Sequence, residues 1–352
     1  MALRSSFPSR ADSNAAGGPA AEPVPVTVIG AGVAGAWQAL LFAKAGHAVT
    51  LHERGDASLL QSTGYHAGGM LAPWCEGEDS EPVITRLGAR SLDLWRRELP
   101  DTPFHGSLVV AHPRDRADFD RLARLTEGFE RIDAAGIAEL EPALDGRFRE
   151  GLFFAGEGHV EPRRVLPALH ARLEAAGATI RYNSDLSPHD AEGLVIDCRG
   201  LAARDTVPDL RGVKGEMAII ETHEVALTRP VRLVHPRWPI YIIPRGDGRF
   251  MIGATAIESE DRGVTLRSAL ELLSAAYAVH PAFGEARILE LGANLRPALP
   301  DNLPRIAISA DRRTISVNGL YRHGFLLAPA LAELTVNYVT RGAIDNEVMQ
   351  CG

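Results

Sequence analysis

The sequence predicts an α/β fold with two parts, one built on a parallel β-sheet covered by helices and one built on a largely antiparallel sheet. Three observations support this prediction. A β-branched run at residues 24–29 meets a glycine-spaced turn and continues into an alanine- and leucine-rich segment, which is the order strand, tight turn, helix. A second apolar run, residues 48–52, ends at an acidic residue. Further on, between residues 214 and 254, short apolar runs alternate with turn residues, as in successive antiparallel strands.

The first of these segments, residues 24–43, has the form of a Rossmann-type dinucleotide-binding motif. Gly30 permits a sharp turn, Gly32 leaves room for a pyrophosphate to reach backbone N–H groups, and Gly35 lets the helix lie close to the strand. The phosphates then lie at the positive end of the helix. Glu53 follows about 20 residues after the glycines, where an acid can accept hydrogen bonds from both ribose hydroxyls. A glycine turn can also be purely structural, but the strand, the helix and the acid all agree with a dinucleotide site.

Composition excludes several classes of function. The 352 residues suffice for two domains with sizeable cores, and 45% of them are hydrophobic, as in ordinary globular proteins. The formal net charge of −8 gives no general attraction to nucleic acid or to anionic lipid. Three distant cysteines, Cys75, Cys198 and Cys351, are too few for a disulfide framework or a cysteine zinc site. We therefore expect a cytoplasmic protein without a metal site and without nucleic-acid partners.

The first 23 residues are rich in Ala, Ser, Gly and Pro and lack the apolar core of a secretory signal. We expect residues 1–23 to form a disordered tail. The apolar helix after Gly35 is interrupted by Gln38 and Lys44 and is too short to cross a bilayer, so we expect no membrane anchor.

The remaining elements are predicted in chain order from their periodicity. Residues 61–73 are rich in glycine and small residues, which favours a loop lying against a ligand over a plain surface turn. An amphipathic helix over 81–99 ends before Pro100. We then expect the following strands and helices: strand 106–111, helix 114–127, strand 151–154, helix 162–176, strands 178–182 and 194–198, strands 217–220, 231–234, 240–244 and 250–253, helix 266–279, strand 286–295, strand 315–319 and helix 330–340.

These elements divide the chain into a discontinuous dinucleotide-binding domain and a substrate-binding domain. We assign residues 24–99, 156–212 and 285–345 to the first, and residues 100–155 and 213–284 to the second. The turn at 245–248 is predicted to join two strands of the antiparallel sheet as a hairpin.

Six ordered segments resemble the D-amino-acid-oxidase-like flavoproteins, and within them the glycine oxidases of thiamine biosynthesis. The resemblance runs from about residue 24 to residue 340, and it is carried by residues 28–32, 67–71, 241–245, 253–255, 295–301 and 319–329. It implies that the dinucleotide is FAD and not NAD.

The resemblance also implies which residues bind FAD. For the phosphates and the adenosine half these are Gly30, Gly32, Val33, Ala34, Gly35, Glu53, Arg54 and, over the adenine, Leu186. For the flavin side they are Thr63, Gly64, Gly68, Gly69 and Met70. A loop over residues 320–326 would bring backbone N–H groups to the isoalloxazine ring, which involves Leu320, Tyr321, Arg322, His323, Gly324, Phe325 and Leu326.

For the substrate, the resemblance points to Arg296, whose guanidinium suits two-point binding of an amino acid carboxylate. The alternative is a surface salt bridge. Tyr241 would add a hydroxyl to the same site, or it is a core aromatic of a strand. Arg322 would raise the positive potential near the flavin, or it pairs with an acid. His66 and His323 lack a partner at metal-ligand spacing and are expected to serve structure or to line the flavin edge.

The implied reaction is oxidation of glycine, sarcosine or D-alanine by hydride transfer from Cα to flavin N5. It gives an imine or 2-oxo acid, ammonia and, with molecular oxygen, hydrogen peroxide, and it would supply thiazole formation in thiamine biosynthesis. Thiazole synthase is then an expected partner, and relatives suggest a homo-oligomer. Three alternatives stay open: a D-amino acid dehydrogenase with another electron acceptor, a flavin-binding subunit of a larger complex, and an NAD-linked dehydrogenase.

Overall fold

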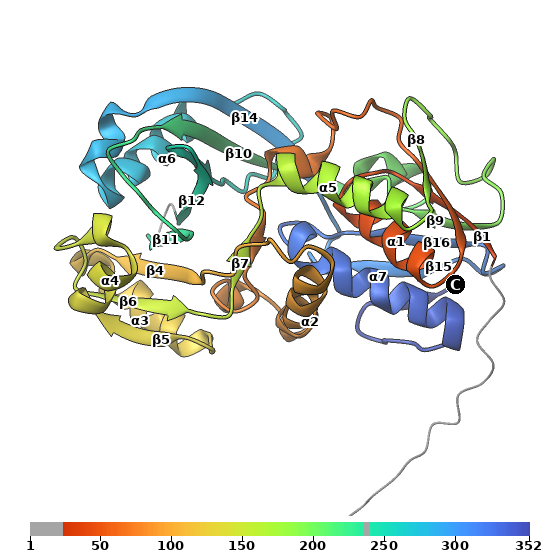
Figure 1. Cartoon of the computed structure of the whole chain (residues 1–352), viewed down its shortest axis with the longest axis horizontal. Coiled ribbons are helices and arrows are strands. Elements are labelled where there is room, and N and C mark those ends of the chain that lie inside the picture. Colours follow the sequence, from red (N-terminus) through yellow and green to blue (C-terminus); the bar gives the residue numbers. More distant parts are fainter. Residues whose placement is uncertain (1–23, 236–238) are drawn as a thin grey trace, which may run out of the picture.

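The computed structural model describes residues 24–235 and 239–352, and it places two β-sheets side by side (Figure 1). The tail expected over residues 1–23 lies outside the described residues. Both parts of the predicted fold class are confirmed, because one sheet is mostly parallel and the other mostly antiparallel.

The first sheet has seven strands in the order β17-β15-β16-β9-β1-β2-β8. Its parallel centre joins β1 to β2 and β9, while β15 and β16 pair antiparallel. Helices α1, α5, α2 and α7 pack around it (Figure 1). The bounds are β1 Pro25–Ile29, α1 Val33–Lys44, β2 Ala48–His52, α2 Pro82–Glu98, α5 Pro162–Ala175, β8 Thr179–Arg181, β9 Leu194–Asp197, β15 Arg305–Ile308, β16 Thr314–Asn318, α7 Gly324–Arg341 and β17 Met349–Cys351.

The core of this part follows directly from the apolar runs of the sequence. β1 and β9 lie inside the sheet, so both of their faces are covered and their residues form near-continuous hydrophobic runs. α1 is buried along most of its length, and the rings of Trp37 and Trp95 meet edge to face with centroids 4.9 Å apart. This contact packs α1 against α2.

The second sheet has eight strands in the order β14-β10-β13-β12-β11-β4-β6-β5. All neighbours pair antiparallel except β11 and β4. The bounds are β4 Ser107–Ala111, α3 Arg116–Leu125, β5 Glu130–Asp133, α4 Ala134–Leu140, β6 Glu150–Phe154, β10 Arg211–Glu221, β11 Val231–Val234, β12 Ile240–Gly246, β13 Arg249–Gly253, α6 Leu266–Val279 and β14 Arg287–Ala298.

Shorter elements complete the described part of the chain. A separate antiparallel pair is formed by β3 (Met70–Leu71) and β7 (Gly158–His159). The 3-10 helices are η1 Thr63–His66, η2 Gly77–Asp79, η3 Pro113–Asp115, η4 Pro142–Leu144, η5 Gly200–Asp205 and η6 Pro281–Glu285.

The structure corrects the predicted domain boundary near residue 285. β14 was expected in the dinucleotide-binding domain, but it pairs along its whole length with β10 and forms an edge of the eight-stranded sheet. A strand of 12 residues needs a partner of similar length to satisfy its backbone, and β10 with 11 residues provides one. The apolar pattern alone does not reveal which sheet a strand joins.

The start of α7 also differs from the prediction, which placed a loop over residues 320–326 and a helix from residue 330. The helix begins at Gly324, so Pro329 lies inside it. Proline has no N–H for the carbonyl four residues earlier, that of Phe325. The indole N–H of Trp95 donates to this oxygen at 2.9 Å, which explains why the helix tolerates the proline.

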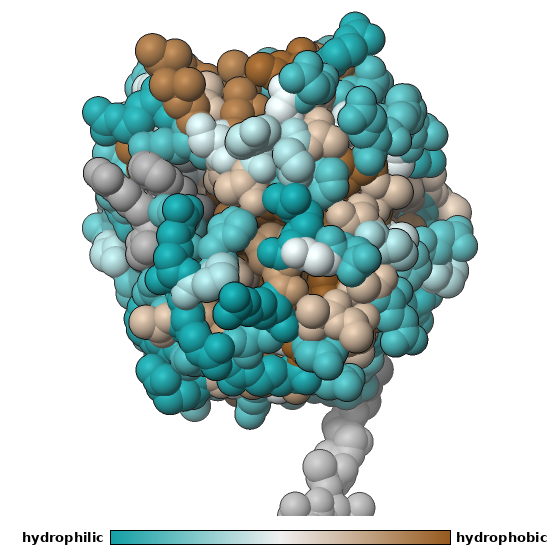
Figure 2. Space-filling model, turned by 90° about the vertical axis from the view of Figure 1, so that its left-hand side faces the viewer, coloured by the Kyte–Doolittle hydropathy of each residue, from teal (hydrophilic) through white to brown (hydrophobic). Residues whose placement is uncertain are grey.

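Apolar side chains are exposed on α6 and on the first half of β14. Figure 2, which faces this end of the molecule, shows apolar atoms gathered along its upper edge, where these elements lie. The exposed apolar residues there are Leu266, Leu270, Tyr277, Ile288, Leu289 and Leu291.

Candidate functional site

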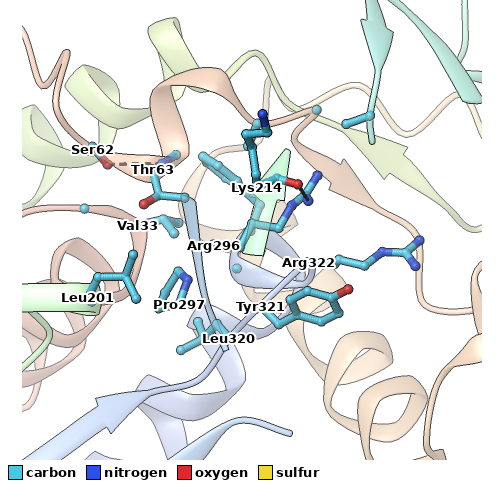
Figure 3. Close-up of a pocket in the computed structure, with 18 of the residues that line it drawn as sticks. Val33, Ser62, Thr63, Leu201, Lys214, Arg296, Pro297, Leu320, Tyr321 and Arg322 are labelled. Atoms are coloured by element: carbon cyan, nitrogen blue, oxygen red, sulfur yellow. Dashed lines mark hydrogen bonds between the residues drawn. The ribbon is translucent and has the colours of Figure 1, made fainter. Parts of the chain in front are cut away.

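A cavity of about 1690 Å³ lies between the two sheets and is lined by both of them. In Figure 3 the charged side chains Lys214, Arg296 and Arg322 lie on one side of it, and Val33, Leu201, Pro297 and Leu320 lie on the other. The cavity therefore has an apolar and a cationic side.

The glycine turn after β1 forms one end of this cavity. Gly30 has a φ of +95°, and a Cβ on Gly35 would lie 1.8 Å from the Gly30 carbonyl oxygen, so both positions require glycine. Gly32 precedes α1 and has no side chain to cap the first N–H groups of that helix. These groups, at the positive end of a helix, are suited to bind phosphate.

The Glu53 carboxylate is held at the end of β2 by backbone N–H groups. Its Oε2 accepts from Ala31 at 2.8 Å and its Oε1 from Gly55 at 2.9 Å. Glu53 lines the cavity together with Arg54 and Leu186. The acid expected to bind ribose is thus fixed next to the glycine turn.

The glycine-rich loop before β3 lies along the cavity and is held from behind by Arg245. The guanidinium donates to the carbonyl oxygens of Gly68 at 2.8 Å, Ala67 at 3.2 Å and Val160 at 2.8 Å. Burial lowers the pKa of Arg245 to about 10. A Cβ on Gly69 would lie 2.2 Å from the Val160 carbonyl oxygen, so the loop packs with no room for a side chain there.

The start of α7 forms the opposite wall. Leu320, Tyr321, Arg322, Gly324 and Phe325 line the cavity. No side chain caps the first turn of α7, so a second positive helix end is directed at the cavity.

Arg296, on β14, is half-buried at the cavity wall and donates only to backbone among the described residues. Its Nη1 lies 2.9 Å from the Thr255 carbonyl oxygen and 3.4 Å from that of Lys214. Burial and the nearby charge of Arg322 lower its pKa to about 10, so it remains a cation at neutral pH. Among residues 24–235 and 239–352 it forms no salt bridge, the alternative considered for it, and the guanidinium is available for an anion.

Arg322 and Tyr241 lie close to the same acidic turn. Arg322 Nη2 is 3.9 Å from Glu76 Oε1. Arg322 therefore pairs with an acid, which was the alternative to a role at the flavin considered for this residue. The Tyr241 hydroxyl lies 3.2 Å from Cys75 Sγ, and burial raises its pKa well above 10. Tyr241 is therefore a neutral phenol at the cavity wall.

Most of the predicted site residues line the cavity. Those that do are Gly30, Gly32, Val33, Ala34, Glu53, Arg54, Thr63, Gly64, Gly68, Gly69, Met70, Leu186, Tyr241, Arg296, Leu320, Tyr321, Arg322, Gly324 and Phe325. Three others lie behind the wall. Gly35 packs under the turn, Leu326 lies against the position of Gly88, and His323 is buried 3.5 Å from Glu76.

His323 is a neutral histidine, because burial lowers its pKa to about 4. His66 lies outside the cavity, 3.7 Å from Glu290. Within residues 24–235 and 239–352, no group of His, Cys, Asp and Glu side chains could hold a metal ion.

Sequence reasoning missed four residues at the cationic side: Glu76, Lys214, Gly215 and Arg232. Lys214 is almost fully buried and pairs with Glu216 at 3.1 Å. A Cβ on Gly215 would lie 2.4 Å from Arg296 Nη2, so the guanidinium occupies the space that Gly215 leaves. Charged residues inside the apolar runs of β10 and β11 were a signal for Lys214 and Arg232, whereas Glu76 lies in an acidic stretch that reads as exposed.

The cavity fits a dinucleotide. It offers two helix N-termini without side-chain caps, a fixed acid at the ribose position and glycines whose Cβ atoms would fill the available space. The fold and site together define a dinucleotide-binding protein.

The chain belongs to the DAO family of FAD dependent oxidoreductases, which matches residues 25–338. It is 53% identical over 313 residues to the "Putative thiamine biosynthesis oxidoreductase ThiO" of Rhizobium etli, covering 87% of this chain and 94% of that protein. It is also 29% identical over 297 residues to a "Bifunctional protein ThiO/ThiG" of Trichormus variabilis, covering 81% of this chain and 41% of that protein.

Among solved structures, glycine oxidase from Geobacillus kaustophilus has the same fold, with a TM-score of 0.75 and 24% identity over 92% of this chain and 96% of that one. The predicted resemblance, the FAD cofactor and the assignment to FAD-dependent amino acid oxidases are confirmed. None of the helices in the described ranges is both long and apolar enough to span a bilayer.

Proposed function

We propose that the protein oxidises glycine, or another small amino acid such as sarcosine or D-alanine, to the imine. Water then hydrolyses the imine to the 2-oxo acid and ammonia, or methylamine where sarcosine is the substrate. Molecular oxygen would be the final electron acceptor and hydrogen peroxide the second product. The similarity to a relative named for thiamine biosynthesis supports a role in thiazole formation.

The observation that carries this proposal is a cation without a carboxylate partner. Among the described residues, Arg296 donates only to carbonyl oxygens, and its pKa is lowered because burial and Arg322 disfavour its charge. A substrate carboxylate would supply the missing negative charge and accept two parallel N–H bonds. The site is therefore best suited to a small amino acid bound through its carboxylate.

The other side chains have distinct roles in this proposal. The neutral Tyr241 hydroxyl would donate a second contact to the carboxylate, and Arg322 would add positive potential that Glu76 partly neutralises. Bound FAD would supply the acceptor for the hydride that leaves the substrate Cα. Arg296 and Tyr241 would orient the substrate for this transfer, and such positioning provides much of the rate.

We also infer a cytoplasmic homo-oligomer that passes its product to thiazole synthase. The exposed apolar residues of α6 and β14 support burial against a second copy, because large apolar patches are uncommon on monomers. The relative named as a bifunctional ThiO/ThiG protein supports the thiazole synthase partner. Light scattering of the purified protein would measure the number of copies.

Anaerobic mixing with a panel of small amines, followed by flavin absorbance, tests the function. We expect glycine to bleach the wild-type flavin, and Arg296→Met to raise the glycine concentration for half-maximal bleaching at least about a hundredfold, since a buried charged contact contributes about 3 kcal/mol. Bleaching at unchanged glycine concentrations would exclude Arg296 as the carboxylate anchor.

The same samples separate the alternatives. Peroxide formation in air supports an oxidase, whereas reduction of a dye without peroxide indicates a dehydrogenase. Stable FAD binding with no bleaching by any amine would favour a flavin-binding subunit.

A further inference from the structure

The turn between β3 and α2, residues 74–78, contacts the substrate side of the cavity at several points. Cys75 Sγ lies 3.2 Å from the Tyr241 hydroxyl, and Glu76 Oε1 lies 3.9 Å from Arg322. Burial by itself raises the pKa of Glu76, but the charges of Arg322 and Arg232 outweigh it, so the net shift is downward. Glu76 is therefore ionised and paired.

The buried Arg232, on β11, ties the same turn to the eight-stranded sheet. It donates to the Cys75 carbonyl oxygen and, at 2.7 Å, to Glu78 Oε1. Residues 74–78 thus connect Tyr241, Arg232 and Arg322, although these three come from different segments of the chain.

Glu157 fixes the backbone of this turn from the side away from the cavity. Its side chain is fully buried, and Oε1 accepts from the N–H groups of Trp74 at 2.9 Å and Cys75 at 2.8 Å. Burial raises its pKa to about 7, although the N–H groups of Cys75 and Trp74 and the Ser107 hydroxyl act in the opposite direction. Glu157 does not line the cavity, so it does not touch the substrate.

We infer that Glu157 is a positioning residue, which sets residues 74–78 and through them the Tyr241 hydroxyl and the Arg322 guanidinium. The inference rests on the proposed function, because it assigns these two groups to substrate binding. Removing Glu157 leaves two buried N–H groups without an acceptor. The turn then shifts to satisfy them, and the groups that contact Cys75 and Glu76 shift with it.

The test compares Glu157→Ala with Glu157→Gln in the holoenzyme. The amide oxygen of glutamine can still accept both N–H bonds, whereas alanine cannot. Glu141→Ala is the matched control, since Glu141 is also fully buried and also accepts backbone N–H groups, from Thr228 and Arg229, but lies outside the cavity lining. Binding of acetate, a carboxylate without an amine, is measured through the flavin spectrum, together with KM, kcat and Tm.

We expect Glu157→Ala to weaken acetate binding and raise KM at least about tenfold, because small displacements of positioned groups cost one to two orders of magnitude. Glu157→Gln should stay within about threefold of the wild type. Glu141→Ala should lower Tm and leave acetate binding unchanged. Wild-type acetate affinity in Glu157→Ala, or equal weakening in Glu141→Ala, would overturn the inference.

A second variant covers the case in which Glu157→Ala yields no holoenzyme. The Thr126 hydroxyl donates to the Trp74 carbonyl oxygen and so restrains the same turn. Thr126→Val should weaken acetate binding, and an unchanged affinity would contradict the inference. Failure of the proposed function gives a different result: no amine bleaches the flavin of the wild-type protein. The flavin spectrum can still report acetate binding in that case, so the effect of Glu157 on the site can still be measured.

Discussion

Substitution of Gly215 by alanine tests the position of the Arg296 guanidinium most directly. Gly215 lies on β10 opposite Asn294, and Arg296 lies two residues further along β14, opposite Val213. A Cβ added there would lie 2.4 Å from Nη2, 2.5 Å from Cζ and 2.7 Å from Nη1 of Arg296. The whole guanidinium must therefore move. Gly215 has no positive φ, so the backbone of β10 does not itself require glycine at this position.

The size of the effect follows from this distance. Ordinary contact between a Cβ and Nη2 requires about 3.4 Å, so the guanidinium must move by about 1 Å from its present position. A displacement of about 1 Å in a positioning group can cost about a hundredfold, and tenfold corresponds to about 1.4 kcal/mol. We expect Gly215→Ala to raise KM for glycine and the Kd for acetate by about tenfold to a hundredfold.

The assay measures steady-state peroxide formation and acetate titration of the flavin spectrum. Gly212→Ala is the control on the same strand, since the nearest atoms to its Cβ would belong to the Glu260 side chain, at 3.2 Å. If Gly215→Ala binds acetate as tightly as Gly212→Ala, the carboxylate does not bind to the Arg296 guanidinium, and the proposed orientation of the substrate is wrong.

Three further predictions concern the other end of the site and the fold. Tyr241→Phe removes the hydroxyl beside Cys75 and should raise KM about threefold to tenfold with little change in kcat, because one hydrogen bond contributes about 1 kcal/mol; equal kinetics would exclude the hydroxyl from the site. Glu53→Gln weakens the acceptor next to the glycine turn and should raise the Kd for FAD about tenfold, measured by fluorescence of released flavin. His323 has a pKa lowered from 6.5 to about 4 by burial, so the folded state binds fewer protons than the unfolded state and the free energy of unfolding falls as pH falls below about 6.5. Urea unfolding should show His323→Asn losing about 2 kcal/mol less than the wild type between about pH 7.5 and about pH 5; identical slopes would contradict this assignment.

The dinucleotide end of the site was predictable from the sequence because its determinants are local. Gly30, Gly32 and Gly35 lie within one turn, and Glu53 follows at the end of the next strand. Neighbouring parallel strands bring these segments together wherever the motif folds. The order of residues along the chain was thus enough to place the acid beside the glycines.

The substrate end depends on contacts between distant segments. Arg232 is 157 residues from Cys75 and 154 from Glu78. The sequence around either segment therefore does not indicate that the two are in contact. From the sequence, Gly215 is a glycine that weakens a strand. Only the pairing of β10 with β14 shows that the absence of a Cβ there leaves space for the Arg296 guanidinium. Arg296 itself was predicted through family resemblance, since one arginine after a strand has no distinguishing local feature.

The start of α7 shows how such a contact shapes the site. Local chemistry predicts that a proline at residue 329 ends a loop, because the carbonyl four residues earlier loses its donor. The Trp95 indole, 230 residues away, supplies that donor to Phe325. The helix therefore extends back to Gly324, and its first turn faces the cavity. A phenylalanine at position 95 would keep the ring in the core but leave the Phe325 oxygen without a donor. The wall against which the flavin is proposed to lie thus depends on Trp95, which does not itself line the cavity.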